Sequence, residues 1–446
     1  MTLRITTADF DLLLEHVFRS APEEGGAFLW CRSSGENLLV RGVRGFEEEE
    51  LDRAVGGLQL TEEAKVALLR QAKLAGDAVV DVHNHPMATS KVGFSPLDQS
   101  ELPDFARYVQ LKLPDRAFGA LVLGTHSVDG IIWKGRSKQR LDLEVVGEMS
   151  SLPKWMSSGP GDESIDLATF DRQLRALGRD AQTRLHSLKV AIVGLGGTGS
   201  VVVEQLAHLG VRRYVLVDDD RVEASNLPRL AGATRKDAAR QTMKSKVAER
   251  LIRQIANRPE IVLESSLRSK RSLAAVQAVD LIVGCVDNDG ARLILTELAA
   301  AYMVPYLDIG VSIEREVDGN LLSGGRVAFF IPGRPCLACA DEIDFGEAAE
   351  DLESEALRSI RIARGYARDR RVEAALMPLN GTVAGMAMME LLAYVSGFRT
   401  VIPFFRYDAS RQRTVIQHVT RQLDCPICGI AFAMGDSQVI GRYAID

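Results

Sequence analysis

Apolar residues in the first 135 positions fall in short runs between polar turns, and this pattern predicts a compact α/β unit. The opening "MTLRITTADFDLLLEHVF" predicts a short strand that leads into an amphipathic helix near residues 8–19. A second helix is predicted at about 61–75. Strands are predicted at "GGAFLWCR", "NLLVRGV", "DAVVDVH", "AFGALVLG" and "GIIWKG".

The segment 151–164, "SLPKWMSSGPGDES", has little apolar periodicity and is rich in Ser, Gly and Pro, which is typical of a linker. After it come the helical "DLATFDRQLRALGRDAQTRLHSL", the β-run "KVAIVG", a glycine-rich turn, a helix and "RYVLVDDD". This order is a βαβ unit that opens a doubly wound sheet, for which "VDLIVGCVDN" and "VPYLDIGV" supply further buried strands. A helix that contains "GTVAGMAMMELLAYVSG" is expected near the end.

A chain of 446 residues exceeds the usual size of a single core, so more than one domain is expected. We predict an α/β domain at residues 1–150, a linker at 151–167 and a doubly wound, Rossmann-like α/β domain at 168–446. The formal net charge of −6 is spread without a basic block, which argues against a dedicated nucleic-acid-binding protein. There is no apolar run of about 18 residues and no signal-peptide layout, so we expect a cytoplasmic protein without a membrane segment.

Two histidines close the predicted strand "DAVVDVH", in the stretch "DVHNHP". Because side chains alternate along a strand, His83 and His85 point to the same side, and Asp98 can return to complete three ligands. Three protein ligands plus one water are the arrangement of a catalytic zinc site, and zinc lowers the pKa of its bound water to about 7. The alternative is that the histidines merely cap a strand beside a proline turn.

The chemistry of such a site also needs a carboxylate that takes a proton and a donor that stabilises an oxyanion. Upstream, "APEEGGAFL" places Glu23 and Glu24 beside two glycines, and Ser95 lies three residues before Asp98. The order E-x-x-G, H-x-H-P, S-x-x-D resembles the JAMM (JAB/MPN) metalloprotease family, which cuts peptide or isopeptide bonds after ubiquitin-like proteins.

This resemblance implies a residue-by-residue assignment of roles in the first domain. Glu23 matches the general base, with Gly26 at the motif glycine, and Ser95 matches the oxyanion-stabilising serine. The implied ligands of the catalytic zinc are His83, His85 and Asp98. The sequence departs from the family pattern at Asn84, where Ser or Thr is usual.

The glycine-rich turn "VAIVGLGGTGS" follows a buried strand directly and opens a helix. Glycines there allow a tight turn and a close approach of the backbone to phosphate, which the helix N-terminus attracts. The glycines are Gly194, Gly196, Gly197 and Gly199. Asp218, about 20 residues on, suits a ribose hydroxyl. Taken alone, these features also fit an NAD-linked oxidoreductase.

The continuation "VLVDDDRVEASNLPRL" resembles the ubiquitin-activating superfamily, the ThiF/MoeB-like adenylyltransferases, over residues 168 to 446. Leu230 replaces the usual Gln of its motif. The resemblance implies binding of ATP and Mg²⁺, with Asp287 at the magnesium position and Lys246 at the ATP-contacting lysine, for which Lys244 is the alternative. The other positions that match the family's ATP site are Asp218, Asp220, Asn226, Arg229 and Asn288. It also implies a homodimer, because Arg172 matches an arginine that acts in the partner subunit's ATP site.

Adenylation brings a carboxylate against an α-phosphate, and two anions repel strongly in a dry pocket. Mg²⁺ on Asp287 and the cations Arg172, Arg229 and Lys246 would neutralise this charge, whereas a dehydrogenase has no use for such a cluster. The alternative for the lysine and the arginines is ordinary solvated surface charge.

Four of the six cysteines form two CxxC pairs, in "GRPCLACADE" and "LDCPICGIA". These are Cys336, Cys339, Cys425 and Cys428. Two pairs fit a closed structural zinc site, and the ThiF/MoeB resemblance places two such pairs here, while a disulfide or redox role is the alternative. The segment from Ala340 to Pro378, where many ubiquitin-activating enzymes carry their nucleophile, contains no cysteine.

The two cysteines that remain are Cys31, in the first domain, and Cys285, which we interpret as a core residue. The adenylate is therefore expected to pass to sulfide, to another protein's thiol or directly to an amine. As a whole, the chain is interpreted as a bifunctional enzyme of a bacterial ubiquitin-like or sulfur-carrier pathway, which leaves sulfur transfer and antiviral conjugation both open.

The expected partner is a ubiquitin-like or sulfur-carrier protein with a C-terminal glycine, and a conjugating enzyme or sulfur donor is a further candidate. The zinc peptidase would mature this protein or remove it from conjugates, and the second domain would adenylate its C-terminal glycine. Two alternatives remain open. One is a catalytically decayed binding or sensor protein for the same partner, and the other is an NAD-linked oxidoreductase.

Overall fold

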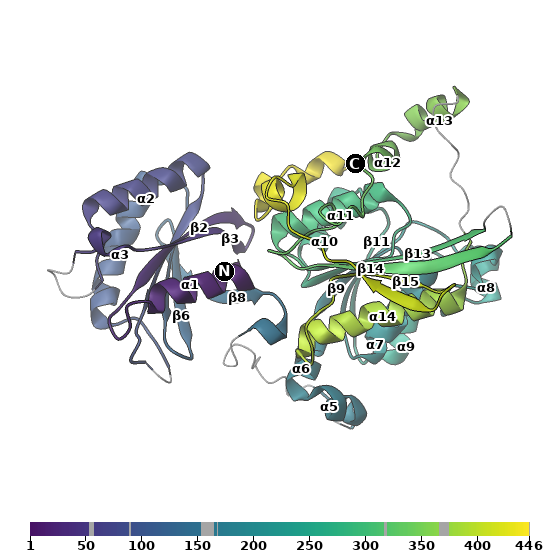
Figure 1. Cartoon of the computed structure of the whole chain (residues 1–446), viewed down its shortest axis with the longest axis horizontal. Helices are drawn as coiled ribbons and strands as arrows, with labels where there is room; N and C mark the ends of the chain where they lie inside the picture. The colour runs from purple at the N-terminus through teal and green to yellow at the C-terminus, as the bar shows by residue number, and fades with distance from the viewer. Residues whose placement is uncertain are drawn as a thin grey trace.

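The chain contains two eight-stranded sheets, each covered by helices on both faces (Figure 1). The computed structural model describes residues 1–52, 58–88, 91–152, 165–166, 168–315, 319–364 and 374–445. The first sheet uses strands between Thr2 and Val146, and the second uses strands between Lys189 and Ile416. The sheets thus fall on either side of the expected linker, most of which lies outside the described residues. The domain boundaries at 150 and 168 stay predictions.

The first sheet has the strand order β7-β6-β5-β4-β2-β3-β1-β8 and mixes parallel with antiparallel pairs. Its strands are β1 (Thr2–Thr6), β2 (Gly26–Ser34), β3 (Asn37–Gly45), β4 (Ala78–Asn84), β5 (Phe118–Leu123), β6 (Val128–Lys134), β7 (Ser137–Arg140) and β8 (Asp142–Val146). Its helices are α1 (Thr7–Phe18), α2 (Glu62–Ala75) and α3 (Pro96–Lys112). The predicted strands and the two predicted helices are present, whereas β7, β8 and α3 were not predicted.

Alternation along β4 divides the core of this sheet into two layers. Val80 and Val82 face the cluster that contains α1, whereas Val79 faces the cluster that contains α2 and α3. The same alternation carries His83 to one side at the carboxyl end of the strand, opposite Gly26 of β2.

The second sheet has the order β11-β10-β9-β12-β13-β14-β15-β16. The pairs from β11 to β13 are parallel and those from β13 to β16 are antiparallel. The strands are β9 (Lys189–Val193), β10 (Arg213–Val217), β11 (Glu260–Glu264), β12 (Leu281–Gly284), β13 (Tyr306–Arg315), β14 (Leu321–Phe330), β15 (Phe404–Asp408) and β16 (Arg413–Ile416). The predicted doubly wound, Rossmann-like α/β fold is therefore confirmed for this domain, with an antiparallel extension added to the parallel part.

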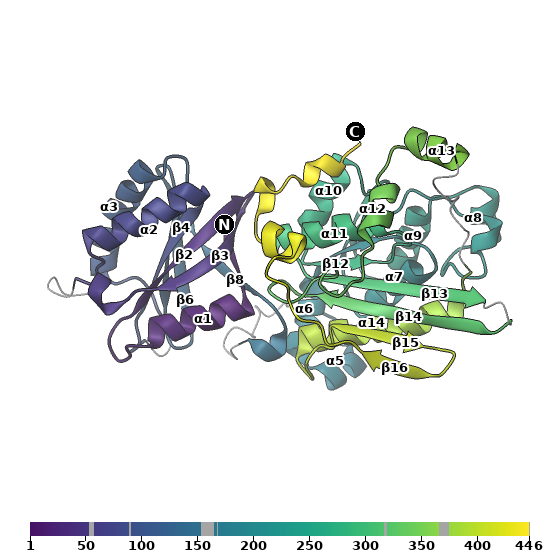
Figure 2. The same cartoon turned by 45° about the horizontal axis from the view of Figure 1, so that its top comes forward.

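Helices cover both faces of the second sheet. The helices of this domain are α5 (Asp171–Leu177), α6 (Arg179–Ser187), α7 (Gly197–His208), α8 (Arg235–Ala239), α9 (Lys244–Ile255), α10 (Lys270–Gln277), α11 (Asp289–Tyr302), α12 (Phe345–Asp351), α13 (Glu355–Ala363) and α14 (Met377–Ser396). Side chains of α7, α9 and α14 pack on one face, and those of α10 and α11 pack on the other (Figures 1 and 2). Val190 and Ile192 of β9 point into the first of these layers and Ala191 and Val193 into the second, so β9 lies at the centre of the domain.

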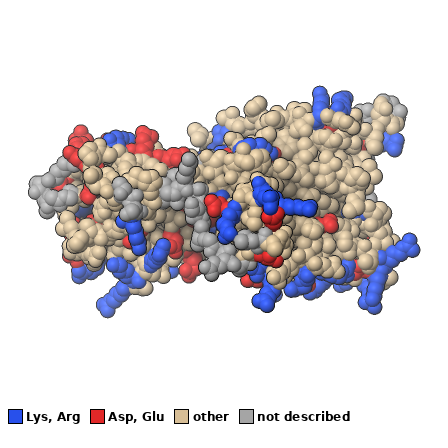
Figure 3. Space-filling model, turned by 90° about the horizontal axis from the view of Figure 1, so that it is seen from below, with Lys and Arg blue, Asp and Glu red and all other residues tan. Residues whose placement is uncertain are grey.

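Charged side chains of both signs are dispersed over the face of the molecule that Figure 3 shows. In Figure 3, Lys and Arg are spread over both halves of the visible face, with Asp and Glu between them. Among the described residues, none of the helices combines the length and the apolar character needed to span a bilayer.

Candidate functional site

The turn between β9 and α7 packs tightly against the backbone of Cys285 on one side and has open space at Gly196 on the other. Gly194 has φ +86°, and a Cβ there would lie 2.5 Å from the carbonyl oxygen of Cys285. A Cβ on Gly199 would lie 1.9 Å from the carbonyl oxygen of Gly194. A Cβ on Gly196 would meet no atom of the described structure within 4 Å. The turn therefore requires glycine at 194 and 199 for packing, while position 196 leaves the backbone open to a ligand.

A cavity of about 1730 Å³ opens above this turn. It extends from the glycine turn to the ends of β10 and β12 and along β13, β14 and β15. The predicted nucleotide-site residues in its wall are Gly194, Gly196, Gly197, Asp218, Asp220, Arg229, Asp287 and Asn288. In the part of the chain that the structure describes, Gly199, Asn226, Lys246 and Arg172 are not in this wall.

Within the described residues, the lysine in the cavity wall is Lys244, which the family motif left as the alternative to Lys246 for contact with ATP. Both residues lie in the first turn of α9, and residues two apart on a helix are rotated by about 200°. Lys244 has 11% of its side chain exposed, and its Nζ lies 2.5 Å from Oδ2 of Asp220. Lys246 has 58% of its side chain exposed and pairs at 3.0 Å with Glu249.

Asp218 and Asn226 hold the loops around the cavity. Oδ2 of Asp218 accepts the amide hydrogen of Leu195 at 2.6 Å, and its Oδ1 accepts that of Asp220 at 2.9 Å. Burial raises the pKa of the Asp218 carboxyl, although Lys244 and these amides act in the opposite direction. Asn226 is buried and its Oδ1 accepts the amide hydrogen of Glu223 at 3.0 Å. Asn226 thus fixes the turn that leads to Arg229 and lies outside the described wall of the cavity, while its predicted contact with a ligand stays a prediction.

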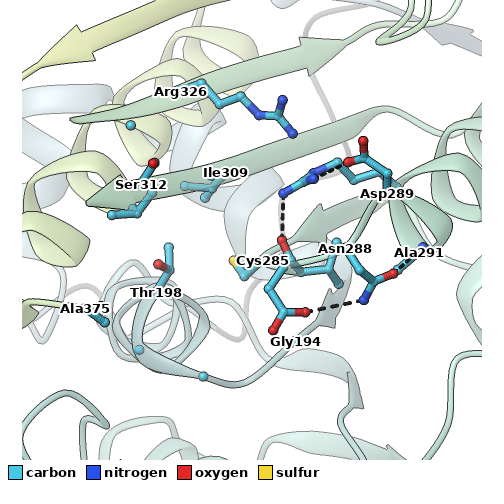
Figure 4. A pocket seen from close by; sticks show the side chains of 18 of the residues that line it. Gly194, Thr198, Cys285, Asn288, Asp289, Ala291, Ile309, Ser312, Arg326 and Ala375 are labelled. Carbon is cyan, nitrogen blue, oxygen red and sulfur yellow. Dashed lines mark hydrogen bonds and ion pairs between the residues drawn. The ribbon is translucent and has the colours of Figure 1, made fainter. Parts of the chain in front are cut away.

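Among the cavity residues missed from the sequence are two arginines, Arg292 and Arg326, that lie beside a buried aspartate. Arg326 of β14 donates to Oδ2 of Asp308 at 3.1 Å, and Nε of Arg292 lies 3.6 Å from the same oxygen. Asp308 has 0% of its side chain exposed, and the hydroxyl of Tyr306 donates to its Oδ1 at 2.7 Å. Arg292 also forms an ion pair with Asp289 (Figure 4). The only sign of this charged cluster in the sequence was a charged residue, Asp308, within the apolar run "VPYLDIGV".

Figure 4 shows that Arg326, Asp289 and Asn288 lie on the opposite side of the cavity from Thr198, which belongs to α7. Arg172 lies on the exposed face of α5. The cavity thus combines bare backbone amides, carboxylates and cations in one space, which is the composition that binding of a metal-complexed polyphosphate requires.

The first domain brings the three predicted metal ligands together. Nε2 of His83 and Nε2 of His85 each lie 3.4 Å from Oδ2 of Asp98. Nε2 of His83 is buried and has no hydrogen-bond partner among the described residues. A buried nitrogen without a hydrogen bond, beside a second imidazole and a carboxylate, fits a divalent metal such as zinc.

The first turn of α3 orients Asp98. Ser95 is the N-cap of this helix: its Oγ accepts the amide hydrogen of Asp98 at 3.1 Å, and Oδ2 of Asp98 accepts that of Ser95 at 2.7 Å. Burial disfavours the ionised carboxylate, but His83 and Ser95 outweigh burial and lower the pKa of Asp98 to about 2. The hydroxyl hydrogen of Ser95 is not used by this cap and stays able to donate.

Asn84 holds the segment that carries the two glutamates. The amide of Gly25 donates to Oδ1 of Asn84 at 2.7 Å, and Asn84 is fully buried. The carboxylate of Glu24 approaches His85, with Oε1 3.7 Å from Nε2 of the histidine. The sequence favoured Glu23 for the general base, and this contact makes Glu24 an equal candidate.

The four cysteines of the CxxC pairs form a second cluster of potential metal ligands. Cys336 and Cys339 lie in the loop after β14, and Cys425 and Cys428 lie at the short helix η5 (Pro426–Ala431). Sγ–Sγ distances are 3.9 Å for Cys336–Cys339, 3.6 Å for Cys336–Cys425 and 3.4 Å for Cys339–Cys428. Four thiolates at 2.3 Å around a tetrahedral zinc would be about 3.8 Å apart, whereas a disulfide requires about 2 Å. The cysteines therefore fit a closed zinc site and are not disulfide-bonded in this structure.

Comparison with known proteins finds a match over the second domain. The model of the ThiF family matches residues 170–427. The chain is similar to ubiquitin-like modifier-activating enzyme 5 of Oryza sativa subsp. japonica, with 29% identity over 274 residues that cover 55% of this chain and 58% of the relative. For the Arabidopsis thaliana protein of the same name, identity is 30% over 277 residues, which cover 55% of this chain and 57% of that relative. The chain thus spans less than three fifths of the length of these relatives.

Among solved structures, Escherichia coli MccB with MccA-N7isoASN matches with a TM-score of 0.48 and 19% identity, over 60% of this chain and 76% of that one. The structure of PaaA matches with a TM-score of 0.43 and 18% identity, over 58% of this chain and 85% of that one.

The glycine turn gives a matched pair of variants. Gly199→Ala is expected to lower the free energy of unfolding by about 2 kcal/mol or more, because its Cβ would overlap the Gly194 carbonyl. Gly196→Ala is expected to keep the stability of the wild type and to weaken ATP binding about tenfold, because its methyl group would occupy the open face of the turn. Denaturant unfolding and calorimetric ATP titration measure the two effects. Equal stability of both variants would contradict the packing argument.

Metal analysis tests the two ligand clusters separately. We expect two zinc ions per purified chain, one ion in His85→Ala and one ion in a variant with Cys425→Ser and Cys428→Ser, because each change removes ligands from one cluster only. Elemental mass spectrometry of the folded proteins measures the stoichiometry. A full complement of zinc in either variant would show that the cluster it alters is not a metal site.

Proposed function

We propose, because the chain belongs to the ThiF family, that its second domain uses ATP and Mg²⁺ to adenylate the C-terminal glycine of a ubiquitin-like or sulfur-carrier protein. The observation that carries this proposal is the single cavity in which the open glycine turn faces Asp287, Lys244 and Arg229. Ligand pockets are commonly about 300–1,000 Å³. A cavity of about 1730 Å³ leaves room for a nucleotide together with an extended protein tail.

In the proposed reaction, the terminal carboxylate oxygen of the tail attacks the α-phosphorus of ATP, the bond to the bridging oxygen breaks, and pyrophosphate leaves. Asp287 and Asn288 would hold Mg²⁺, which when bound neutralises phosphate charge. Lys244, Arg229 and Arg326 line the cavity where both anions must be accommodated. Their charges lower the repulsion between the carboxylate and the phosphates, and this repulsion is the main obstacle to the reaction.

The acceptor of the activated glycine is proposed to lie outside this chain. Cys285 is the one cysteine in the cavity wall within the described ranges, and its backbone supports the glycine turn from below. Burial raises the pKa of its thiol, so the thiolate needed for a thioester is disfavoured. Sulfide, a thiol of another protein or an amine is the acceptor we propose.

We further propose that the second domain forms a homodimer. The exposed Arg172 lies on α5, away from the wall of its own cavity as far as the structure is described. This position suits an arginine that reaches the cavity of a second copy, as the family resemblance implies.

For the first domain we propose a zinc-dependent peptidase that cuts after the C-terminal glycine of the same partner protein. His83, His85 and Asp98 would hold the metal, which when bound lowers the pKa of a water molecule. A carboxylate of the Glu23–Glu24 pair would take the proton, and the Ser95 hydroxyl would donate to the oxyanion. The two domains would then act on one protein end: the peptidase exposes or releases the glycine, and the second domain activates it.

Partner-dependent ATP–pyrophosphate exchange tests the adenylation. With a panel of ubiquitin-like and sulfur-carrier proteins, Asp287→Ala and Lys244→Ala are each expected to lower exchange about 100-fold, since each removes charge compensation from the reacting phosphates. Lys246→Ala is the matched control and is expected to retain exchange, because its side chain lies on the solvent side of α9. Wild-type protein that is folded and zinc-loaded but shows no exchange with any panel member would refute the proposal.

Cleavage of precursors that carry residues beyond the terminal glycine tests the peptidase. His83→Ala is expected to abolish cleavage, because a metal ligand is lost. Of Glu23→Gln and Glu24→Gln, the change at the general base is expected to lower the rate about 100-fold or more with zinc retained. Mass spectrometry of the products measures the rates. Full cleavage by His83→Ala, or by the double Gln variant, would rule out the proposed mechanism.

A further inference from the structure

The segment that follows the second cysteine pair lies between the two domains, where Figure 2 shows a yellow stretch near β3, before the chain continues to its C-terminus above α10. We call residues 429–438 the tail segment. Its Ala433 is fully buried in a cluster with Leu39 of β3 and with Met303, at the end of α11. The amide of Ala433 donates to the carbonyl oxygen of Ala300 at 3.0 Å. The tail segment therefore contacts both domains through buried apolar atoms.

Polar contacts of the tail segment also join the two domains. Oδ2 of Asp436 accepts the amide hydrogen of Gly35 in the first domain at 3.1 Å. Oδ1 of Asp436 accepts the hydroxyl hydrogen of Tyr302 in the second domain at 3.0 Å. At the neighbouring position, a Cβ on Gly435 would lie 2.7 Å from Cβ of Ser34, so only glycine lets the tail segment approach β2 this closely.

The loop that leads to the first cysteine pair also touches the first domain. Arg334, two residues before Cys336, forms an ion pair with Glu148. The Glu148 side chain has 0% exposure, and its Oε2 accepts the amide hydrogen of Val401 at 2.8 Å. Next to this contact, a Cβ on Gly333 would lie 3.2 Å from Cβ of Thr6. A buried carboxylate that loses its charged partner is costly, so this loop is a second specific contact between the domains.

The four cysteines connect the loop around Arg334 with the tail segment. Cys336 of the loop lies 3.6 Å from Cys425, and Cys339 lies 3.4 Å from Cys428, directly before the tail segment. We propose that the four-cysteine site fastens the interface between the domains: one metal ion holds together the loop and the tail segment, and both of these contact the first domain. The far end of the chain is held separately, by the ion pair of Arg442 with Glu297.

This inference does not rest on either proposed activity. It predicts that loss of the metal loosens a particular surface, from Ser34 and Leu39 of the first domain to the tail segment, and leaves the central strands of the second domain in place. A site that only stabilises the second domain would loosen β9 and β10 instead.

Hydrogen–deuterium exchange of the full chain, read by mass spectrometry, tests the proposal. In a variant with Cys425→Ser and Cys428→Ser, peptides that cover residues 33–39 and 430–438 are expected to exchange about tenfold faster or more, with β9 and β10 unchanged. His85→Ala is the control, because it alters the other metal cluster and is expected to leave these peptides protected. Unchanged exchange of these peptides in the metal-free double variant would overturn the proposal, and so would an equal loss of protection in β9 and β10.

A second variant tests the interface without touching the cysteines. Gly435→Leu places a side chain against Ser34 and is expected to speed exchange in residues 33–39 while the zinc stoichiometry stays unchanged. Small-angle scattering is expected to show a larger radius of gyration for both this variant and the double Ser variant. A radius and an exchange pattern equal to those of the wild type in Gly435→Leu would show that the tail segment does not hold the domains together.

Discussion

The tightest glycine packing in the described part of the second domain is that of Gly199 against the carbonyl oxygen of Gly194. A hydrogen atom on the Cα of Gly199 fits there, but a Cβ does not. This contact brings the start of α7 directly onto the end of β9, which is flanked by β10 and β12. Since the carboxyl ends of parallel strands meet at one edge of a sheet, Asp218 after β10 and Asp287 after β12 then lie on either side of the turn. The cavity thus lies where this close approach and the parallel strand order bring the glycine turn and the two aspartates together.

The parallel part of the second sheet could be predicted because its strands are short, uninterrupted apolar runs separated by helical segments. The antiparallel extension could not. The strand β14 is interrupted by Gly324 and Gly325, and all four residues of β16 are exposed, so neither has the pattern of a buried strand. In the first domain, α3 was missed because Pro96 and Pro103 fall within it, although proline is tolerated in the first turn of a helix. The structure thus departs from the prediction where glycine and proline obscure the periodicity.

Among the site residues, positions that depend on local sequence patterns could be predicted, whereas contacts between distant segments could not. His83, near the end of β4, and His85, directly after the strand, both approach Asp98 because alternation along an extended backbone is local, and Asp98 follows from a capping box that the motif contains. Lys246 was preferred over Lys244 by motif spacing, whereas the rotation of α9 decides which lysine faces the cavity. The pairing of Arg326 with Asp308 depends on the register of β14 against β13, which no local pattern encodes.

Arg326, Arg292 and Asp308 also explain how cations can line a cavity before any phosphate is bound. A buried carboxylate without partners would cost several kcal/mol, and free guanidinium groups would repel each other. Asp308 accepts from Arg326, lies 3.6 Å from Arg292 and is oriented by the Tyr306 hydroxyl, so the three charges hold one another in position. Binding of an anion then needs little rearrangement of this wall, and fixed charges of this kind stabilise a developing negative charge more effectively than mobile ones. Lys244 and Arg229, on the glycine-turn side of the cavity, supply positive charge that is not neutralised by Asp308. The buried aspartate therefore serves the same end as the two arginines beside it, because it keeps them fixed where two anions would meet in the proposed reaction.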